Sequence, residues 1–331
     1  LLQSHVVWKV AMWATQRDLN LINQLEKLPS LAEEIENREN DGWHKGVGLQ
    51  KPGTGEFEDN ELSKLPLLEA SDLQRYWVHG ASTSYKLSNQ HLFRRLGKKE
   101  TYYAPHIMIK EAQRNKRFCA AFSDENFAFR HNIFGISATA KDGLLLKALT
   151  AYLNSSFASY YLFLTTSTWG IERERALQKE VLKLPAIPFQ MPRNIVNRLA
   201  VNVEKIGKLL ETGVPDTATE IQEVELQIDE LIFDYLKLSQ TDRILIQDVL
   251  EFGIGFLQDG ENSSACDETS LDDLTQYALL LCQNANSILR FGKKTVWANV
   301  YTGKSPLKII SFHFNNNHNP NTVEIVSSNV E

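Results

Sequence analysis

The sequence predicts an α+β protein that combines a mixed α/β domain, a helical bundle and a small C-terminal unit of one helix and a β-hairpin. Three observations lead to this prediction. Short aromatic and β-branched runs gather between residues 102 and 137, apolar residues at helical spacing dominate residues 143–257, and a last helical pattern precedes two alternating runs near the C-terminus. The 331 residues are 43% apolar and 23% charged, which is typical of globular chains.

Residues 6–39 have helical spacing, with Asp18 and Ser30 as candidate N-caps. Residues 41–55 then contain five glycines, which predicts a loop and a domain boundary. We therefore expect a helical linker over residues 1–40 and a new domain that starts at residue 41. The chain opens without an initiator methionine, so we expect it to be a fragment of a longer protein.

The second domain, residues 41–190, is expected to hold the strands. Four short runs have the length and the composition of strands: residues 102–109, 118–122, 127–129 and 132–137. Helices are predicted over about residues 143–165 and 172–183, because Pro185 and Pro188 cannot continue the second one. An acidic helical bundle is expected over residues 191–258, with a break between its first two helices near Pro215.

Residues 259–331 are expected to form a small α+β unit. A helix over residues 271–289 leads into two alternating runs, residues 295–301 and 307–312, around a turn that contains Gly303. His313 and His318 lie close together in an asparagine-rich stretch, which predicts a hairpin loop or a terminal tail. No cysteine or acidic cluster nearby completes a coordination shell, so no metal site is expected.

Charge is unevenly distributed along the chain. The formal net charge is −6, yet residues 75–117 hold ten basic and two acidic side chains, whereas residues 204–273 carry a net charge of −14. Seven aromatic residues lie within the basic segment or at its ends. This combination suits nucleic acid, because basic side chains neutralise phosphates and aromatic rings stack on bases. The alternative is a solvated charged face above aromatic residues of the core.

Several classes of protein are disfavoured by the sequence. Three cysteines without a C-x-x-C pair leave no disulfide framework or cysteine zinc site, and they favour a reducing, cytoplasmic setting. The most apolar stretch, residues 144–164, is interrupted by Lys147 and several polar residues, so it predicts a core helix rather than a membrane span. There is no P-loop and no G-x-S-x-G elbow, and no acidic residue stands two positions before a lysine, as in the commonest restriction nuclease core.

Seven short motifs follow one another in an order that is typical of one family. They are residues 7–13 with 17–19, Trp43 with Gly46 and Gly48, residues 103–110 (YAPHIMIK), residues 153–161 (LNSSFASYY), residues 169–173 (WGIER), residues 184–188 (LPAIP) and residues 228–236 (IDELIFDYL). Together they resemble the TaqI-like specificity region, which follows the catalytic domain in adenine-N6 DNA methyltransferases of restriction-modification systems. The resemblance fades after about residue 259.

The resemblance implies sequence-specific recognition of double-stranded DNA for an enzyme whose catalytic domain precedes residue 1. The family's Asn-Pro-Pro-Tyr type motif for the flipped adenine and its glycine motif for S-adenosylmethionine are both missing. We therefore expect a fragment with no catalytic site and no cofactor of its own, inside a parent that uses S-adenosylmethionine. Its expected partners are duplex DNA and the N-terminal methyltransferase domain of that parent, and no membrane. Whether the parent also cleaves DNA stays open.

The expected DNA contacts are basic side chains of residues 94–117 and, as second candidates, a group near the Trp-Gly motif. The full set is Arg94, Arg95, Lys98, Lys99, Lys110, Arg114, Lys116, Arg117, Trp169, Arg173 and Arg175. For Trp169 and Arg173 the alternative is structural, as an interface tryptophan and a helix-surface arginine. Two rival functions remain: a protein-interaction scaffold that does not bind DNA, and a nuclease, which the missing acid-x-Lys element disfavours.

Overall fold

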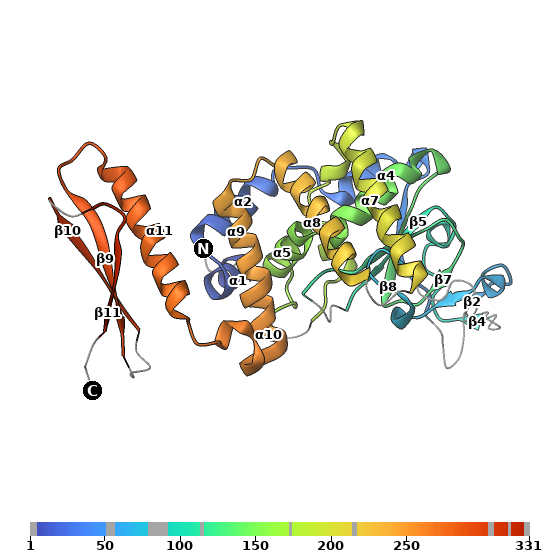
Figure 1. Cartoon of the computed structure of the whole chain (residues 1–331). Coiled ribbons are helices and arrows are strands. Elements are labelled where there is room, and N and C mark those ends of the chain that lie inside the picture. Colours follow the sequence, from blue (N-terminus) through green and yellow to red (C-terminus); the bar gives the residue numbers. More distant parts are fainter. Residues whose placement is uncertain are drawn as a thin grey trace. The chain divides into compact units, whose positions relative to one another are not determined.

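The computed structural model describes residues 5–50, 57–78, 92–112, 116–171, 174–213, 217–303, 308–316 and 319–327. The chain forms two compact units, Leu1–Ala265 and Cys266–Glu331, which we describe separately. Both units combine helices with a sheet (Figure 1). The predicted α+β class is therefore confirmed.

The first unit begins with three short helices, α1 (His5–Trp13), α2 (Gln16–Leu25) and α3 (Leu31–Asn37). Ser30 is the N-cap of α3, as predicted, and its Oγ accepts a hydrogen bond from the Glu33 amide. Asp18 differs from the prediction. Thr15 is the N-cap of α2, and Asp18 occupies the third helical position, where its carboxylate accepts hydrogen bonds from the Thr15 amide and hydroxyl.

A four-stranded antiparallel sheet lies at the centre of the first unit, in the order β1-β8-β5-β6. Its strands are β1 (His44–Val47), β8 (Ile133–Ser137), β5 (His106–Lys110) and β6 (Ala120–Ser123). The prediction of a loop over residues 41–55 is therefore wrong for β1. Gly48, directly after β1, permits close packing instead, because a Cβ there would lie 2.2 Å from the carbonyl oxygen of Arg130.

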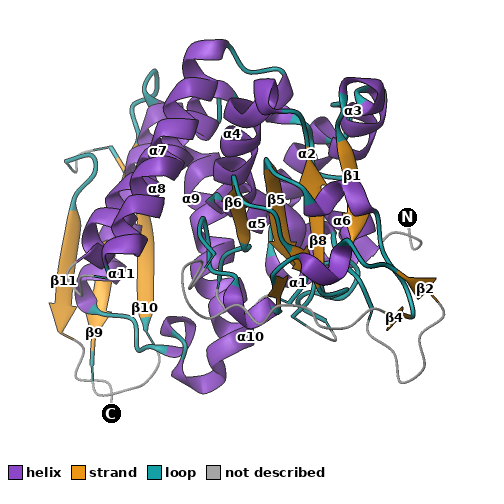
Figure 2. Ribbon diagram, turned by 90° about the vertical axis from the view of Figure 1, so that its right-hand side faces the viewer, coloured by secondary structure: helices purple, strands orange, loops and turns teal. Residues whose placement is uncertain are grey.

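Two small two-stranded sheets accompany the central one. They pair β2 (Phe57–Glu58) with β4 (Leu92–Phe93) and β3 (Leu67–Leu68) with β7 (Ala128–Phe129). We call the first of these pairs the β2–β4 ribbon. In Figures 1 and 2 the central sheet lies between this ribbon and the helices that pack against β6.

The apolar stretch after β8 forms two helices rather than one, α4 (Gly143–Asn154) and α5 (Ser156–Thr165). Ser155 separates them because it is extended, and its hydroxyl accepts a hydrogen bond from the amide of Ala158 as the N-cap of α5. The second predicted helix, residues 172–183, is reduced to α6 (Gln178–Val181), while residues 172 and 173 lie outside the described residues.

The helical bundle contains α7 (Arg193–Thr212) and α8 (Thr217–Tyr235), separated at Gly213 as the sequence predicts. It continues through α9 (Gln240–Asp248), a π-helical segment (Val249–Ile254) and α10 (Gly255–Asp259). Helix α4 packs against both β6 and α7, and α7 packs against α8.

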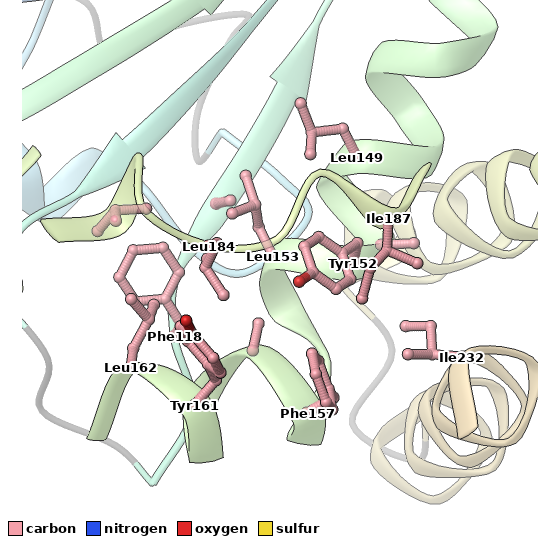
Figure 3. Close-up of a cluster of buried hydrophobic side chains, with 14 of the residues drawn as sticks. Phe118, Leu149, Tyr152, Leu153, Phe157, Tyr161, Leu162, Leu184, Ile187 and Ile232 are labelled. Atoms are coloured by element: carbon pink, nitrogen blue, oxygen red, sulfur yellow. The ribbon is translucent and has the colours of Figure 1, made fainter. Parts of the chain in front are cut away.

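One hydrophobic cluster joins nearly all of these elements, from Val10 in α1 to Ile254 in the π-helical segment. Figure 3 shows part of it, where Tyr152 of α4, Phe157 of α5 and Ile232 of α8 lie in the same cluster. The parts that the sequence divides at residues 40 and 190 therefore share a single interior.

The second unit holds α11 (Leu271–Leu289), β9 (Thr295–Thr302), β10 (Ile309–Asn315) and β11 (Val323–Ser327). The predicted helix and hairpin are confirmed, and β11, which pairs in parallel with β9, was not predicted. His313 lies within β10 rather than in a loop, and its ring stacks on Trp297 at 4.4 Å. His318 lies outside the described residues. Within the described part of the chain, no helix has the length and apolar character that a membrane crossing requires.

Candidate functional site

A cleft of about 690 Å³ lies in the first unit, between the β6 edge of the sheet and the α7–α8 pair. We call it the sheet–bundle cleft. One wall comes from residues 73–76 together with Lys110, Arg117 and Cys119, and the other from residues of α7 and α8. Figure 2 shows the α7–α8 pair and β6 at this end of the sheet. Basic side chains from one segment of the sequence therefore meet the acidic bundle here.

Arg75 is held in the wall of this cleft by residues that are distant in sequence. Its Nη2 lies 2.7 Å from Oε1 of Glu225 in α8 and donates to the carbonyl of Asn154 at 2.9 Å. The next residue, Tyr76, has a φ of 70° and donates its amide hydrogen to the Ala120 carbonyl at 2.8 Å. Residues 75 and 76 are therefore fixed against both β6 and the bundle.

Arg117 makes a second connection to the bundle. Its Nη1 lies 3.3 Å from Oδ2 of Asp229 in α8 and also donates to the hydroxyl of Ser156. Asp229 in turn accepts a hydrogen bond from the Ser156 amide at 2.7 Å, at the start of α5. Because Asp229 is buried, Arg117 balances a charge of the interior.

Three further basic residues predicted to contact DNA lie in ion pairs within the chain. Lys98 pairs with Glu39 at 2.5 Å, Arg175 pairs with Glu111 at 2.6 Å, and Lys99 pairs with the buried carboxylate of Asp59. Burial alone would raise the pKa of Asp59, yet hydrogen bonds from Lys99 and from two backbone amides keep that pKa below its usual value. These pairs offset much of the positive charge that the sequence assigns to the segment.

Arg94 and Arg95 differ from these residues because both are exposed and neither forms an ion pair within the described residues. They directly follow β4, and their backbone is fixed by Gln50, whose amide donates to the Arg95 carbonyl at 2.9 Å and whose carbonyl accepts from the Arg94 amide at 3.0 Å. Two guanidinium groups therefore face solvent from a backbone that is hydrogen-bonded on both sides.

The other basic residues that the sequence predicts as DNA contacts are Lys110, Lys116, Arg114 and Arg173. Lys110 lines the sheet–bundle cleft, and the Lys116 Nζ donates to the Glu251 carbonyl at 3.4 Å. Arg114 and Arg173 lie outside the described residues. Among the described residues, no group of three His, Cys, Asp or Glu side chains is arranged to hold a metal ion.

The prediction that Trp169 contacts DNA is wrong, because its side chain is fully buried. Its ring packs edge-on against Phe163 at 5.7 Å, and its carbonyl accepts a hydrogen bond from the buried ammonium group of Lys9. Gly170 follows with a φ of +82°, and a Cβ there would lie 2.5 Å from the Phe163 ring. The Trp-Gly motif therefore serves the core, which is the structural alternative that the sequence left open.

Sequence reasoning did not single out Arg75, Tyr76, Glu225 and Asp229 as site residues. Arg75 was counted within the basic segment, but its role depends on Glu225 in a helix that the sequence places in another domain. Arg117 and Asp229 are likewise 112 positions apart. No local spacing in a single sequence could have indicated these pairs.

Residues 65–186 match the family model of the TaqI-like C-terminal specificity domain, so the predicted resemblance is confirmed over this segment. Three solved structures are similar at low identity. The Type IIL restriction-modification enzyme MmeI in complex with DNA has 11% identity over 62% of this chain and 35% of that chain, with a TM-score of 0.40. A type I R-M system has 11% identity over 71% of this chain and 56% of that chain, with a TM-score of 0.28. The HsdS subunit from Thermoanaerobacter tengcongensis has 12% identity over 71% of this chain and 57% of that chain, with a TM-score of 0.29. The chain thus aligns with 35–57% of the length of these chains. No curated protein matches it.

Proposed function

We propose that this chain, whose residues 65–186 match the TaqI-like C-terminal specificity domain, recognises a specific sequence in double-stranded DNA. In this proposal it serves an adenine-N6 DNA methyltransferase of a restriction-modification system in the cytoplasm. The N-terminal methyltransferase domain of the parent would supply catalysis and bind S-adenosylmethionine, and this chain would contribute no catalytic residue. The family match is the observation that carries the proposal.

The exposed pair Arg94 and Arg95 supports DNA binding in physical terms. An enzyme that modifies a base takes it out of the stack, so a companion domain must hold the distorted duplex. Phosphate contacts fix the position of a protein on DNA, whereas contacts to base edges give specificity. The guanidinium groups of Arg94 and Arg95, which form no ion pair within the described residues, can neutralise a phosphate without competition from such a partner.

Of the basic residues predicted from the sequence, the ion-paired ones are weaker candidates. Glu39, Asp59 and Glu111 already offset the charges of Lys98, Lys99 and Arg175, so a phosphate gains less from these residues. We therefore assign the main phosphate contacts to Arg94 and Arg95, with Lys116 as an additional contact.

The proposal is tested by fluorescence anisotropy of the purified chain with random duplex DNA, between about 50 and 200 mM salt. We expect a log-linear loss of affinity with salt. The double variant Arg94→Ala/Arg95→Ala should bind more weakly across all sequences, with a salt slope that is flatter by about 1.8, or about 0.9 for each phosphate contact.

The matched control is Lys205→Ala/Lys208→Ala, which removes the same charge from α7. Its salt slope should equal that of the unmodified chain. Equal losses in both double variants would mean that only net charge matters and would contradict the assignment to Arg94 and Arg95. If the folded chain binds no duplex even when the methyltransferase domain is added, the scaffold function is favoured instead.

A further inference from the structure

We propose that the sheet–bundle cleft binds the phosphate group of an anionic ligand. This site differs from the pair Arg94 and Arg95, because that pair follows the β2–β4 ribbon, on the far side of the central sheet from the α7–α8 pair (Figure 2). The proposal does not require that the chain recognise DNA.

Three cationic side chains converge on the cleft from separate segments of the chain. Arg75 comes from the residues before β4, Lys110 from the end of β5 and Arg117 from the residues before β6, whereas Glu225 is the one carboxylate among the described lining residues. Each guanidinium carries five N–H donors, so Arg75 and Arg117 retain donors for a phosphate oxygen beyond their pairs with Glu225 and Asp229. Glu225 and Asp229 hold Arg75 and Arg117 in fixed positions, which orders the site before a ligand arrives.

Two buried polar groups in the same wall lack a partner. The hydroxyl of Tyr76 and the Nε of Arg75 are both buried, and neither has a hydrogen-bond partner in the described residues. Buried donors are nearly always satisfied in folded proteins, so these two groups are candidate donors to a ligand in the cleft. A phosphate group offers several acceptor oxygens at once.

The titratable groups of the wall suit an anion as well. Burial raises the pKa of the Tyr76 hydroxyl and raises that of the Cys119 thiol to about 11, so both remain protonated and neutral at physiological pH. Tyr76 also keeps its left-handed backbone conformation, which is rare for an aromatic residue and is concentrated at functional sites. The wall therefore presents donors and positive charge.

The cleft also limits the class of ligand. Its volume of about 690 Å³ lies in the range of sites for small organic ligands and can accommodate a mononucleotide. The carboxylate of Glu225 in the opposite wall disfavours a second phosphate close to the first. Two sources share this chemistry: a free phosphate or mononucleotide, and one backbone phosphate of a DNA duplex.

Isothermal titration calorimetry of the full chain with inorganic phosphate and with a 5′-mononucleotide tests the site without DNA. Tyr76→Phe removes only the orphaned hydroxyl, and Lys110→Met removes one cation while leaving the pairs of Arg75 and Arg117 in place. We expect affinity to fall roughly fivefold in Tyr76→Phe and about tenfold in Lys110→Met. Arg94→Ala, a cation outside the cleft, is the control and should bind as the unmodified chain does.

Duplex titrations of the same variants separate the two sources. Loss of phosphate and mononucleotide binding in both cleft variants, with duplex affinity unchanged, supports a small-molecule site. An equal loss of duplex affinity in both cleft variants, without binding of free phosphate, supports a DNA phosphate in the cleft. The proposal is overturned if neither cleft variant weakens binding. It is also overturned if inorganic phosphate, the mononucleotide and duplex DNA all give no binding signal. Thermal unfolding of each variant verifies that it is folded.

Discussion

The side-chain amide of Asn154 forms two hydrogen bonds with the backbone of Ala120, at the edge of β6. Its Nδ2 donates to the Ala120 carbonyl at 2.7 Å, and its Oδ1 accepts from the Ala120 amide at 3.1 Å. The last residue of α4 thus pairs with the outer edge of β6 as a neighbouring strand would, and it satisfies backbone groups that are buried. The Leu-Asn-Ser motif therefore joins the sheet to the helices.

We expect Asn154→Ala to lower the free energy of unfolding by about 1–3 kcal/mol, because the buried Ala120 amide loses its acceptor. The Ala120 carbonyl keeps the Tyr76 amide as a donor. Urea denaturation measures this change. Asn132→Ala, at an exposed asparagine, is the control and should stay within about 0.5 kcal/mol of the unmodified chain. Equal effects of the two variants would show that Asn154 is not needed at this edge.

Gly170→Ala should destabilise the chain by more than about 2 kcal/mol. A side chain at a φ of +82° is strained, and its Cβ would also overlap the ring of Phe163. Gly143→Ala is a matched control, because a Cβ at Gly143 meets nothing within 4 Å and the residue is helical. That variant should be neutral or slightly stabilising. Thermal unfolding of the pair decides whether the Trp-Gly motif is structural.

Lys99→Met should lower the free energy of unfolding by about 2 kcal/mol, because it leaves the buried carboxylate of Asp59 without a counter-charge. The double variant Lys99→Met/Asp59→Asn should recover part of that loss, since the amide carries no charge. Arg94→Ala, which breaks no ion pair within the described residues, should change stability by less than about 0.5 kcal/mol. A Lys99→Met variant as stable as Arg94→Ala would contradict this structural role.

Lys9 should make stability depend on pH above neutrality. Burial lowers the pKa of this lysine from about 10.5 to about 7, although Glu180 nearby raises it. Between these values the unfolded chain binds the proton and the folded chain has released it, so stability from this group rises with pH from about 7 towards 10.5.

The pH effect of Lys9 is measured as the difference in unfolding free energy between the unmodified chain and Lys9→Met at pH 7, 8 and 9. The difference should shift in favour of the unmodified chain by at most about 1.4 kcal/mol for each pH unit. Loss of the hydrogen bonds to Thr166 and Trp169 in the variant does not change with pH, so it leaves the slope intact. A difference that is constant over this range would refute the assignment.

Elements with strong local signals could be predicted from the sequence. Helix α11 has the predicted bounds because Ser270 caps it through the Asp273 amide, and Gly213 separates α7 from α8 in a left-handed conformation. Elements that depend on distant partners were missed. Strand β11 pairs with β9, and β1 lies in a glycine-rich stretch where Gly48 allows close backbone packing.

The candidate site was predictable in composition but not in geometry. Its basic residues could be counted along the chain, and Arg94 and Arg95 are indeed exposed. The partners of Arg75 and Arg117 lie in α8, and only the folded chain brings them together. Trp169 was misplaced because a Trp-Gly pair looks the same in sequence whether its ring faces solvent or the core.

The family match ends at residue 186, but the interior to which those residues belong continues through α7, α8 and the π-helical segment. A cassette of residues 65–186 moved into a relative would therefore carry only part of a hydrophobic core, and its apolar surface would have to fit a foreign bundle. Exchange of exposed side chains such as Arg94 and Arg95 on the intact chain would leave this interior undisturbed. The matched segment is therefore one part of a larger folding unit.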